Sequence, residues 1–270
     1  MRDKTFFDPD IARVAHLLAD TARDVILPYF RNGDLISDNK LVSGYDPVTE
    51  ADRAAERAMR DILTRDRPDD AILGEEYGTV DGTSGLTWVL DPIDGTRGFV
   101  SGTPTWGVLI AVSDGDGPFF GLVDQPYIGE RFVGSPLGAE MTGPQGQTRL
   151  AARPFRDLSE ATVFTTFPEV GSALEGAAFR SVADRARLTR YGMDCYAYAL
   201  VAAGQVDLVI EAGLAPYDIQ APIALIKAAG GIVTDWQGGP AHHGGRAVAA
   251  ANAEIHAQAL ALLREAQNDG

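Results

Sequence analysis

The sequence predicts a layered α+β and α/β sandwich, with N-terminal helices and an antiparallel meander sheet followed by a C-terminal alternating α/β lobe. Three patterns support this fold class. Apolar residues recur at helical spacing in residues 11–26 and 49–65. Short apolar stretches separated by glycine-rich turns fill residues 105–149, as in an antiparallel meander, and after Pro154 candidate strands and helices alternate.

Each of the two N-terminal helices has one apolar face. In the second helix, Thr49 is a suitable N-cap, and Asp52 three residues on completes the pattern of a capping box. The polar segment between the helices, residues 33–45, is expected to form a hairpin or a loop. Two helices therefore precede the first clear strands.

Two buried strands of the N-terminal part are predicted to end in acidic turns. Residues 71–73 are apolar and are followed by Gly-Glu-Glu at 74–76. Residues 88–90 look like the end of another strand, and the turn after them, residues 91–96, reads Asp-Pro-Ile-Asp-Gly-Thr. Carboxylates at the end of a strand, beside a glycine that exposes backbone amides, suit a hard cation and a phosphate group. The alternative is a solvated Asp-Pro/Asp-Gly turn.

The other elements are predicted from turns and periodicity in the same way. A boundary near residues 145–155 divides the chain into an N-terminal lobe, residues 1–150, and a C-terminal lobe, residues 151–270. Meander strands are expected at 106–112, 119–123 and 131–133. In the C-terminal lobe, strands are expected at 161–167, 188–191, 206–211, 231–236 and 247–251, and helices at 173–186, 194–203, 218–229 and 253–266.

The composition argues against several classes of function. The 23 basic and 38 acidic residues give a net charge of −15, which argues against nucleic acid as a ligand. No apolar run approaches the roughly 18 residues of a membrane span. The single cysteine, Cys195, excludes an intramolecular disulfide, and together with an N-terminus that lacks an apolar signal core it predicts a cytoplasmic protein.

Acidic residues also stand at the junctions of other predicted elements. Asp46 precedes the second helix, and Asp218 opens the helix at 218–229. Each of these residues alone is most simply a helix N-cap or a turn residue. Several in one chain can converge on one pocket, because functional side chains gather where loops meet regular elements.

These segments resemble the motifs of the inositol monophosphatase family, the magnesium-dependent sugar-phosphate phosphatases. Residues 88–96 satisfy the family motif W-x-[IVL]-D-P-[IL]-D-G-T, and residues 217–231 resemble W-D-x-A-A…E-A-G-G, with Tyr217 for Trp and Ala228 for Glu. The family's G-E-E and D-x-V-T-x-A-D elements also occur in order, and the resemblance extends from about residue 8 to 267. It implies the αβαβα sandwich of the sugar phosphatases.

The resemblance implies a role for each polar residue of these segments. Two or three Mg²⁺ ions per site would have as ligands Glu75, Asp91, Asp94, Asp218 and the Ile93 carbonyl. Catalytic roles fall to Asp46, Glu75 and Thr96, and phosphate-binding amides to Gly95 and Thr96. Outer, orienting groups would be Glu76 and Thr49. The implied activity is hydrolysis of a small-molecule phosphate ester by metal-activated water.

Residues 97–110 and 191–213 are similar to the histidinol-phosphate phosphatase branch of the family, which acts in histidine biosynthesis. Asp194 and Glu211 would contact the substrate, because an acidic pocket favours the ammonium and imidazole groups of histidinol phosphate over the neutral hydroxyls of inositol. The enzymatic alternative is an inositol-1-monophosphatase or a broad sugar-phosphate phosphatase, and the non-enzymatic one is a catalytically silent scaffold. The resemblance also implies a homodimer.

Overall fold

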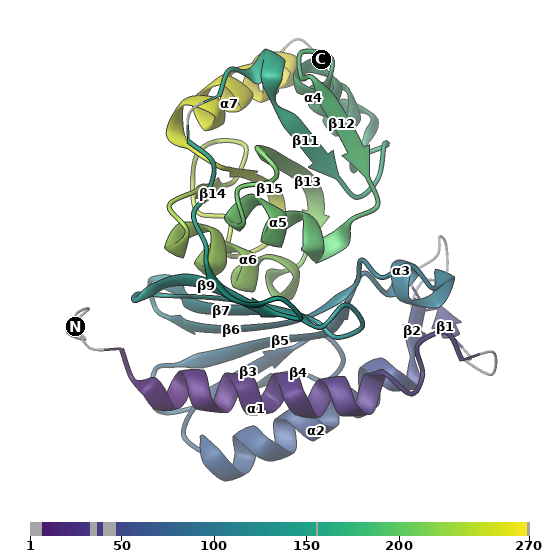
Figure 1. Ribbon diagram of the computed structural model, residues 1–270, viewed down its shortest axis with the longest axis vertical. Coiled ribbons are helices and arrows are strands. Elements are labelled where there is room, and N and C mark those ends of the chain that lie inside the picture. The colour runs from purple at the N-terminus through teal and green to yellow at the C-terminus, as the bar shows by residue number, and fades with distance from the viewer. Residues whose placement is uncertain (1–6, 33–36, 40–46, 155, 269–270) are drawn as a thin grey trace.

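The computed structural model describes residues 7–32, 37–39, 47–154 and 156–268, and these form five layers (Figure 1). Two helices cover the outer face of a large sheet, two more lie between this sheet and a smaller one, and a last pair covers the far side of the smaller sheet. The expected αβαβα sandwich is therefore confirmed. In that order, the helix pairs are α1 (Pro9–Ile26) with α2 (Glu50–Asp66), α5 (Asp194–Ala202) with α6 (Pro216–Ala228), and α4 (Ala173–Ala183) with α7 (Ala253–Asn268).

The large sheet is built by the N-terminal half of the chain. Its strands are β3 (Ala71–Gly74), β4 (Gly78–Val80), β5 (Thr87–Asp94), β6 (Gly107–Asp114), β7 (Gly117–Gln125), β8 (Glu130–Ser135), β9 (Gly138–Gly143) and β10 (Gly146–Arg149). They lie in the order β10-β9-β8-β7-β6-β5-β3-β4, and each neighbouring pair is antiparallel except β3 with β5. The predicted meander is confirmed, whereas the short exposed strand β4 was not predicted.

The smaller sheet is built by the C-terminal half, after a 3₁₀ turn (Leu158–Glu160). Its strands are β11 (Thr162–Thr165), β12 (Leu188–Tyr191), β13 (Leu208–Leu214), β14 (Ile232–Thr234) and β15 (Gly245–Ala250). They lie in the order β12-β11-β13-β15-β14, with β11 parallel to both of its neighbours and β15 antiparallel to both of its own. The predicted alternation of strands and helices is confirmed.

The segment between α1 and α2 contains a short antiparallel pair, β1 (Ser37–Asn39) with β2 (Pro47–Thr49). This pairing supports the hairpin rather than the loop, although the connection itself, with Asp46, lies outside the described residues. The predicted capping box of α2 is present, because the Thr49 amide donates a hydrogen bond to Asp52 Oδ2 over 2.8 Å and the Thr49 side chain accepts one from the Asp52 amide. No helix in the described part of the chain combines the length and apolar character that a membrane span requires.

Two glycines of the meander allow the middle layer to lie close to the large sheet. A Cβ added at Gly121 of β7 would lie 2.3 Å from the Ala221 carbonyl oxygen, and one at Gly134 of β8 would lie 2.3 Å from the Leu225 Cα. Both neighbours are backbone atoms of α6, so any side chain at these positions would push the helix away. Close packing of α6 on the sheet brings its N-terminal turn, which carries Asp218, near the end of β5.

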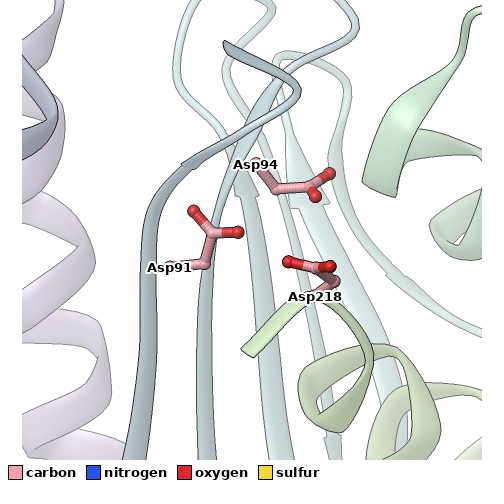
Figure 2. A group of neighbouring side chains, drawn as sticks. All are labelled: Asp91, Asp94 and Asp218. Atoms are coloured by element: carbon pink, nitrogen blue, oxygen red, sulfur yellow. The ribbon is translucent and has the colours of Figure 1, made fainter. Parts of the chain in front are cut away.

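The end of β5 differs from the sequence prediction in a way that matters for the site. The strand was expected to end at Leu90, with a turn following, but it continues to Asp94. In its pairing with β6, Asp91 lies opposite Leu109 and Asp94 opposite Gly107, so three steps along β5 match two along β6. The extra residue is a β-bulge. Residues three apart face opposite sides of a regular strand, and the bulge instead lets Asp91 and Asp94 point the same way (Figure 2).

Candidate active site

Three aspartates converge where β5 meets the first turn of α6 (Figure 2). Asp91 and Asp94 come from the bulged end of β5, and Asp218 comes from the N-terminal turn of α6. One carboxylate oxygen from each lies within 4.8 Å of the others. Asp91 is buried, and the other two are half-buried. The bulge and the close approach of α6 together create this cluster.

The electrostatics of the cluster fit a divalent cation. Burial raises the pKa of Asp91 well above its ordinary value, and the charges of Glu75, Asp94 and Asp218 raise it further. Burial likewise raises the pKa of Asp94, with Asp218 and Asp194 adding to the effect. Carboxylates that repel one another in a buried place are stabilised by a cation between them. The donors are all hard oxygens, which is the set that Mg²⁺ prefers, so these residues fit the expected magnesium.

Glu75 is brought to the cluster by the loop that follows β3. Its amide donates to the Leu90 carbonyl over 3.2 Å, which extends the pairing of β3 with β5. The loop is held from beneath by Glu56, a fully buried residue of α2. Glu56 accepts hydrogen bonds from the amides of Glu76 (2.7 Å) and Tyr77 (3.2 Å). The sequence analysis missed Glu56, although a glutamate among the inward-facing positions of an amphipathic helix was a signal.

Gly95 and Thr96 form the turn between β5 and the short helix α3 (Thr96–Ser101). Gly95 has a φ of 83°, and a Cβ there would lie 2.6 Å from the Asp194 Cγ, so both its conformation and its surroundings require glycine. The Thr96 hydroxyl donates to the Ile93 carbonyl over 3.0 Å. Both Gly95 and Thr96 line the same cavity as the aspartates, as does Ile93.

The cavity beside the aspartates has a volume of about 330 Å³ and takes its walls from both halves of the chain. Its lining includes the carboxylates of Glu75, Asp91, Asp94, Asp194, Glu211 and Asp218. Arg97 is the one basic residue among the described lining residues, and its guanidinium lies 4.7 Å from the centre of the ring of Phe167, which also lines the cavity. A cavity with this lining suits a ligand that brings its own positive charge or binds together with cations.

Glu211 and Asp194 form the acidic wall on the side of the smaller sheet. Glu211 of β13 accepts hydrogen bonds from the Thr166 amide (2.6 Å) and the Thr165 hydroxyl (3.1 Å), and burial raises its pKa to about 7. Asp194 opens α5 with a φ of 46°, rare outside glycine. Its Oδ2 accepts from the Thr105 hydroxyl over 2.8 Å, and burial raises its pKa.

The structure thus brings together most of the residues that the sequence singled out. Two of the orienting candidates lie outside the lining: Thr49 caps α2, and the amide of Glu76 bonds to Glu56. Asp46 lies outside the described residues. Of the residues that the sequence predicted for the site, those that line the cavity are Glu75, Asp91, Ile93, Asp94, Gly95, Thr96, Asp194, Glu211 and Asp218.

The raised pKa of Glu211 predicts a pH-dependent effect on stability. Its folded-state pKa of about 7 lies above the ordinary 4.5, so its stabilising contribution is complete below pH 4.5 and is lost as the pH rises through 7. A shift of this size corresponds to about 3 kcal/mol. The neutral variant Glu211→Gln is therefore expected to be more stable than the wild type at pH 8, with the advantage shrinking at pH 5.

Urea unfolding in EDTA at the two pH values measures this difference. Glu160→Gln, at an exposed glutamate, is the matched control and should leave the difference between the two pH values unchanged. If the Glu211 and Glu160 variants show the same change in unfolding free energy between pH 5 and pH 8, the pKa of Glu211 is not raised by burial.

Comparison with known proteins adds independent information. A model of the inositol monophosphatase family matches residues 9–268. The bifunctional phosphatase IMPL2 (chloroplastic) of Arabidopsis thaliana is 41% identical over 93% of this chain and 74% of its own. A histidinol-phosphatase of Streptomyces coelicolor is 36% identical over 95% of this chain and 97% of its own. The structure of an inositol monophosphatase from Zymomonas mobilis superposes with a TM-score of 0.83 at 37% identity, covering 95% of this chain and 98% of that one.

Proposed function

Because the chain belongs to the inositol monophosphatase family, and so to the phosphatases that hydrolyse phosphoric monoesters, we propose that its substrate is L-histidinol phosphate, which it converts to L-histidinol and phosphate in histidine biosynthesis. The observation that carries this choice is the buried Glu211 carboxylate in the cavity wall, on a different sheet from Asp91 and Asp94. The cavity then has one end for phosphate and another for a cationic alcohol.

At the phosphate end of the cavity, we assign a role to each residue around the aspartate cluster. Glu75, Asp91, Asp94, Asp218 and the Ile93 carbonyl would hold Mg²⁺, which when bound activates the attacking water and neutralises charge on the phosphoryl oxygens. The amides of Gly95 and Thr96 would hold the phosphate oxygens. The Thr96 hydroxyl, now bonded to the Ile93 carbonyl, would orient the water together with Asp46.

At the alcohol end, charge distinguishes the candidate substrates. Histidinol carries a primary ammonium and an imidazole, whereas inositol carries only neutral hydroxyls. Burial favours the protonated Glu211, and a neighbouring ammonium group offsets this by favouring the carboxylate. A cationic alcohol therefore gains an ion pair inside the cavity, and a neutral alcohol leaves the acidic wall without a counter-charge.

Two alternative functions compete with histidinol-phosphate hydrolysis. An inositol-1-monophosphatase or a broad sugar-phosphate phosphatase is favoured by the similarity to the Zymomonas mobilis inositol monophosphatase. A catalytically silent scaffold would have no need for three aspartates held within 4.8 Å of one another at a cost in electrostatic repulsion.

A substrate panel separates the candidates. Phosphate release is measured with Mg²⁺ on L-histidinol phosphate, inositol 1-phosphate and 3′-phosphoadenosine 5′-phosphate, and again in EDTA. We expect kcat/KM for L-histidinol phosphate to exceed that for inositol 1-phosphate by about 100-fold or more, because a buried ion pair is absent with the neutral alcohol. Equal or higher rates on inositol 1-phosphate contradict the proposal, and zero turnover on all three esters supports the scaffold.

The assembly and location of the protein are proposed on the same basis. We propose a homodimer, as the family resemblance implies, and light scattering of the purified protein tests it. A cytoplasmic location is supported by the buried thiol of Cys195, which suits a reducing compartment.

A further inference from the structure

One buried polar group in the cavity wall has no hydrogen-bond partner in the described part of the chain. Tyr198 of α5 is 4% exposed, lines the cavity, and its hydroxyl is buried without a partner among the described residues. Leaving a buried hydroxyl unpaired costs about 1–3 kcal/mol, whereas phenylalanine would fill the same space without this cost. The phenol oxygen is therefore not explained by packing.

The surroundings of this hydroxyl connect the two ends of the cavity. After burial, the charges of Glu211, Asp94 and Asp218 raise the pKa of Tyr198 most strongly, so the phenol stays protonated. Glu211, Asp94 and Asp218 line the same cavity as Tyr198. A phenol both donates and accepts a hydrogen bond. Its oxygen can therefore accept an N–H group from a ligand in the cavity.

The neighbouring tyrosine on the same helix provides a comparison. Tyr196 donates its hydroxyl to Glu130 Oε2 over 2.5 Å, and its ring packs edge-on against Phe132 with centroids 6.0 Å apart. Two residues along a helix lie about 200° apart around its axis, so the two tyrosines face different sides of α5. The hydroxyl of Tyr196 is explained by its own contacts, and that of Tyr198 is not.

We propose that the Tyr198 hydroxyl is a specificity-determining group which, together with Glu211, binds the cationic nitrogen of the alcohol part of the substrate. The inference rests on the proposed function, since it concerns the alcohol end of the same cavity. The ammonium N–H groups are shared between the Glu211 carboxylate and the Tyr198 oxygen, so the hydroxyl that is unpaired in the free protein becomes paired in the complex.

The variant Tyr198→Phe removes only the hydroxyl, and Tyr196→Phe is its matched control. For Tyr198→Phe we expect kcat/KM on L-histidinol phosphate to fall about 10- to 100-fold, as for loss of a hydrogen bond to a charged group. Binding of L-histidinol to the metal-free protein, measured by calorimetry, should weaken by a similar factor. Its Tm should stay equal or rise, because an unpaired buried hydroxyl is removed. Tyr196→Phe should instead lower Tm and leave kcat/KM within about twofold.

The other outcomes overturn the inference in distinguishable ways. If Tyr198→Phe lowers kcat/KM equally on inositol 1-phosphate, or weakens activation by Mg²⁺, the hydroxyl acts on the aspartate cluster and not on the alcohol part of the substrate. A lowered Tm with unchanged histidinol binding would make it a structural group. If the wild type prefers inositol 1-phosphate, the proposed function fails by the substrate panel alone, while histidinol calorimetry on the two tyrosine variants still decides the role of Tyr198.

Discussion

Replacing Asp91 by asparagine is expected to reduce Mg²⁺-dependent phosphate release by about 1,000-fold or more while stabilising the metal-free protein. The loss follows because Asp91 is a proposed metal ligand on which the charges of Glu75, Asp94 and Asp218 all act, and removing one charged ligand would cost several kcal/mol of transition-state stabilisation. The gain follows because burial and these neighbours raise the Asp91 pKa, so its ionised form opposes folding at neutral pH.

Asparagine is a close mimic for this test, since its Oδ1 can still accept the 3.0 Å hydrogen bond from the Ile93 amide. Steady-state rates with Mg²⁺ and urea unfolding in EDTA measure the two effects. Asp81→Asn, at an exposed aspartate, should change neither. A folded Asp91→Asn protein with near wild-type turnover refutes the metal site, and a large loss of stability would make Asp91 a structural residue.

Gly95→Ala is expected to lower kcat/KM by about 100-fold, since a displacement of about 1 Å at the reacting groups costs this much. The new Cβ would lie 2.6 Å from the Asp194 Cγ, so either the turn or Asp194 must move. The turn carries Thr96 and follows Asp94 directly, so the aspartate cluster and the amides proposed to bind phosphate would move with it.

Gly85→Ala separates the clash from simple backbone strain. Gly85 has a similar φ of 81°, but nothing lies within 4 Å of a Cβ added there. Both variants should lose stability through the unfavourable φ, and only Gly95→Ala should lose activity. Equal activity of the two variants would show that the site tolerates movement of this turn.

Local patterns predicted most of the fold. The helical spacing of apolar residues in α1 and α2, and the glycine-rich turns of the meander, depend on neighbours in the sequence, so they could be recognised without the structure. The bulge in β5 could not, because it is defined by the register with β6, and Asp-Pro-Ile-Asp-Gly by itself is typical of a turn. The predicted end of the strand at Leu90 was wrong, but the two aspartates predicted for the site both lie in the cluster.

The parts of the site that were missed share one physical cause. The hydrogen bonds of Glu56 to the loop after β3 form only once α2 lies beneath that loop, and the hydroxyl of Tyr198 is left unpaired only once α5 lies between the sheets. In the sequence, the inward-facing position of Glu56 indicates burial without indicating its partners, and Tyr198 looks like an ordinary residue of a mostly apolar helix. The role of a buried polar group depends on hydrogen-bond partners that are distant along the chain, and the periodicity of the sequence does not identify those partners.

The cavity draws its two ends from different stretches of the chain, and this division has an evolutionary consequence. Apart from Asp218, the proposed phosphate end comes from residues before Arg97, whereas the walls at the proposed alcohol end come from the segment after β11, from α5 and from β13. On the proposed function, substitutions in these later segments would exchange one alcohol for another without disturbing the carboxylates of the proposed phosphate end. A lineage built on this scaffold can diversify its substrates by drift in one half of the gene while purifying selection preserves the chemistry in the other.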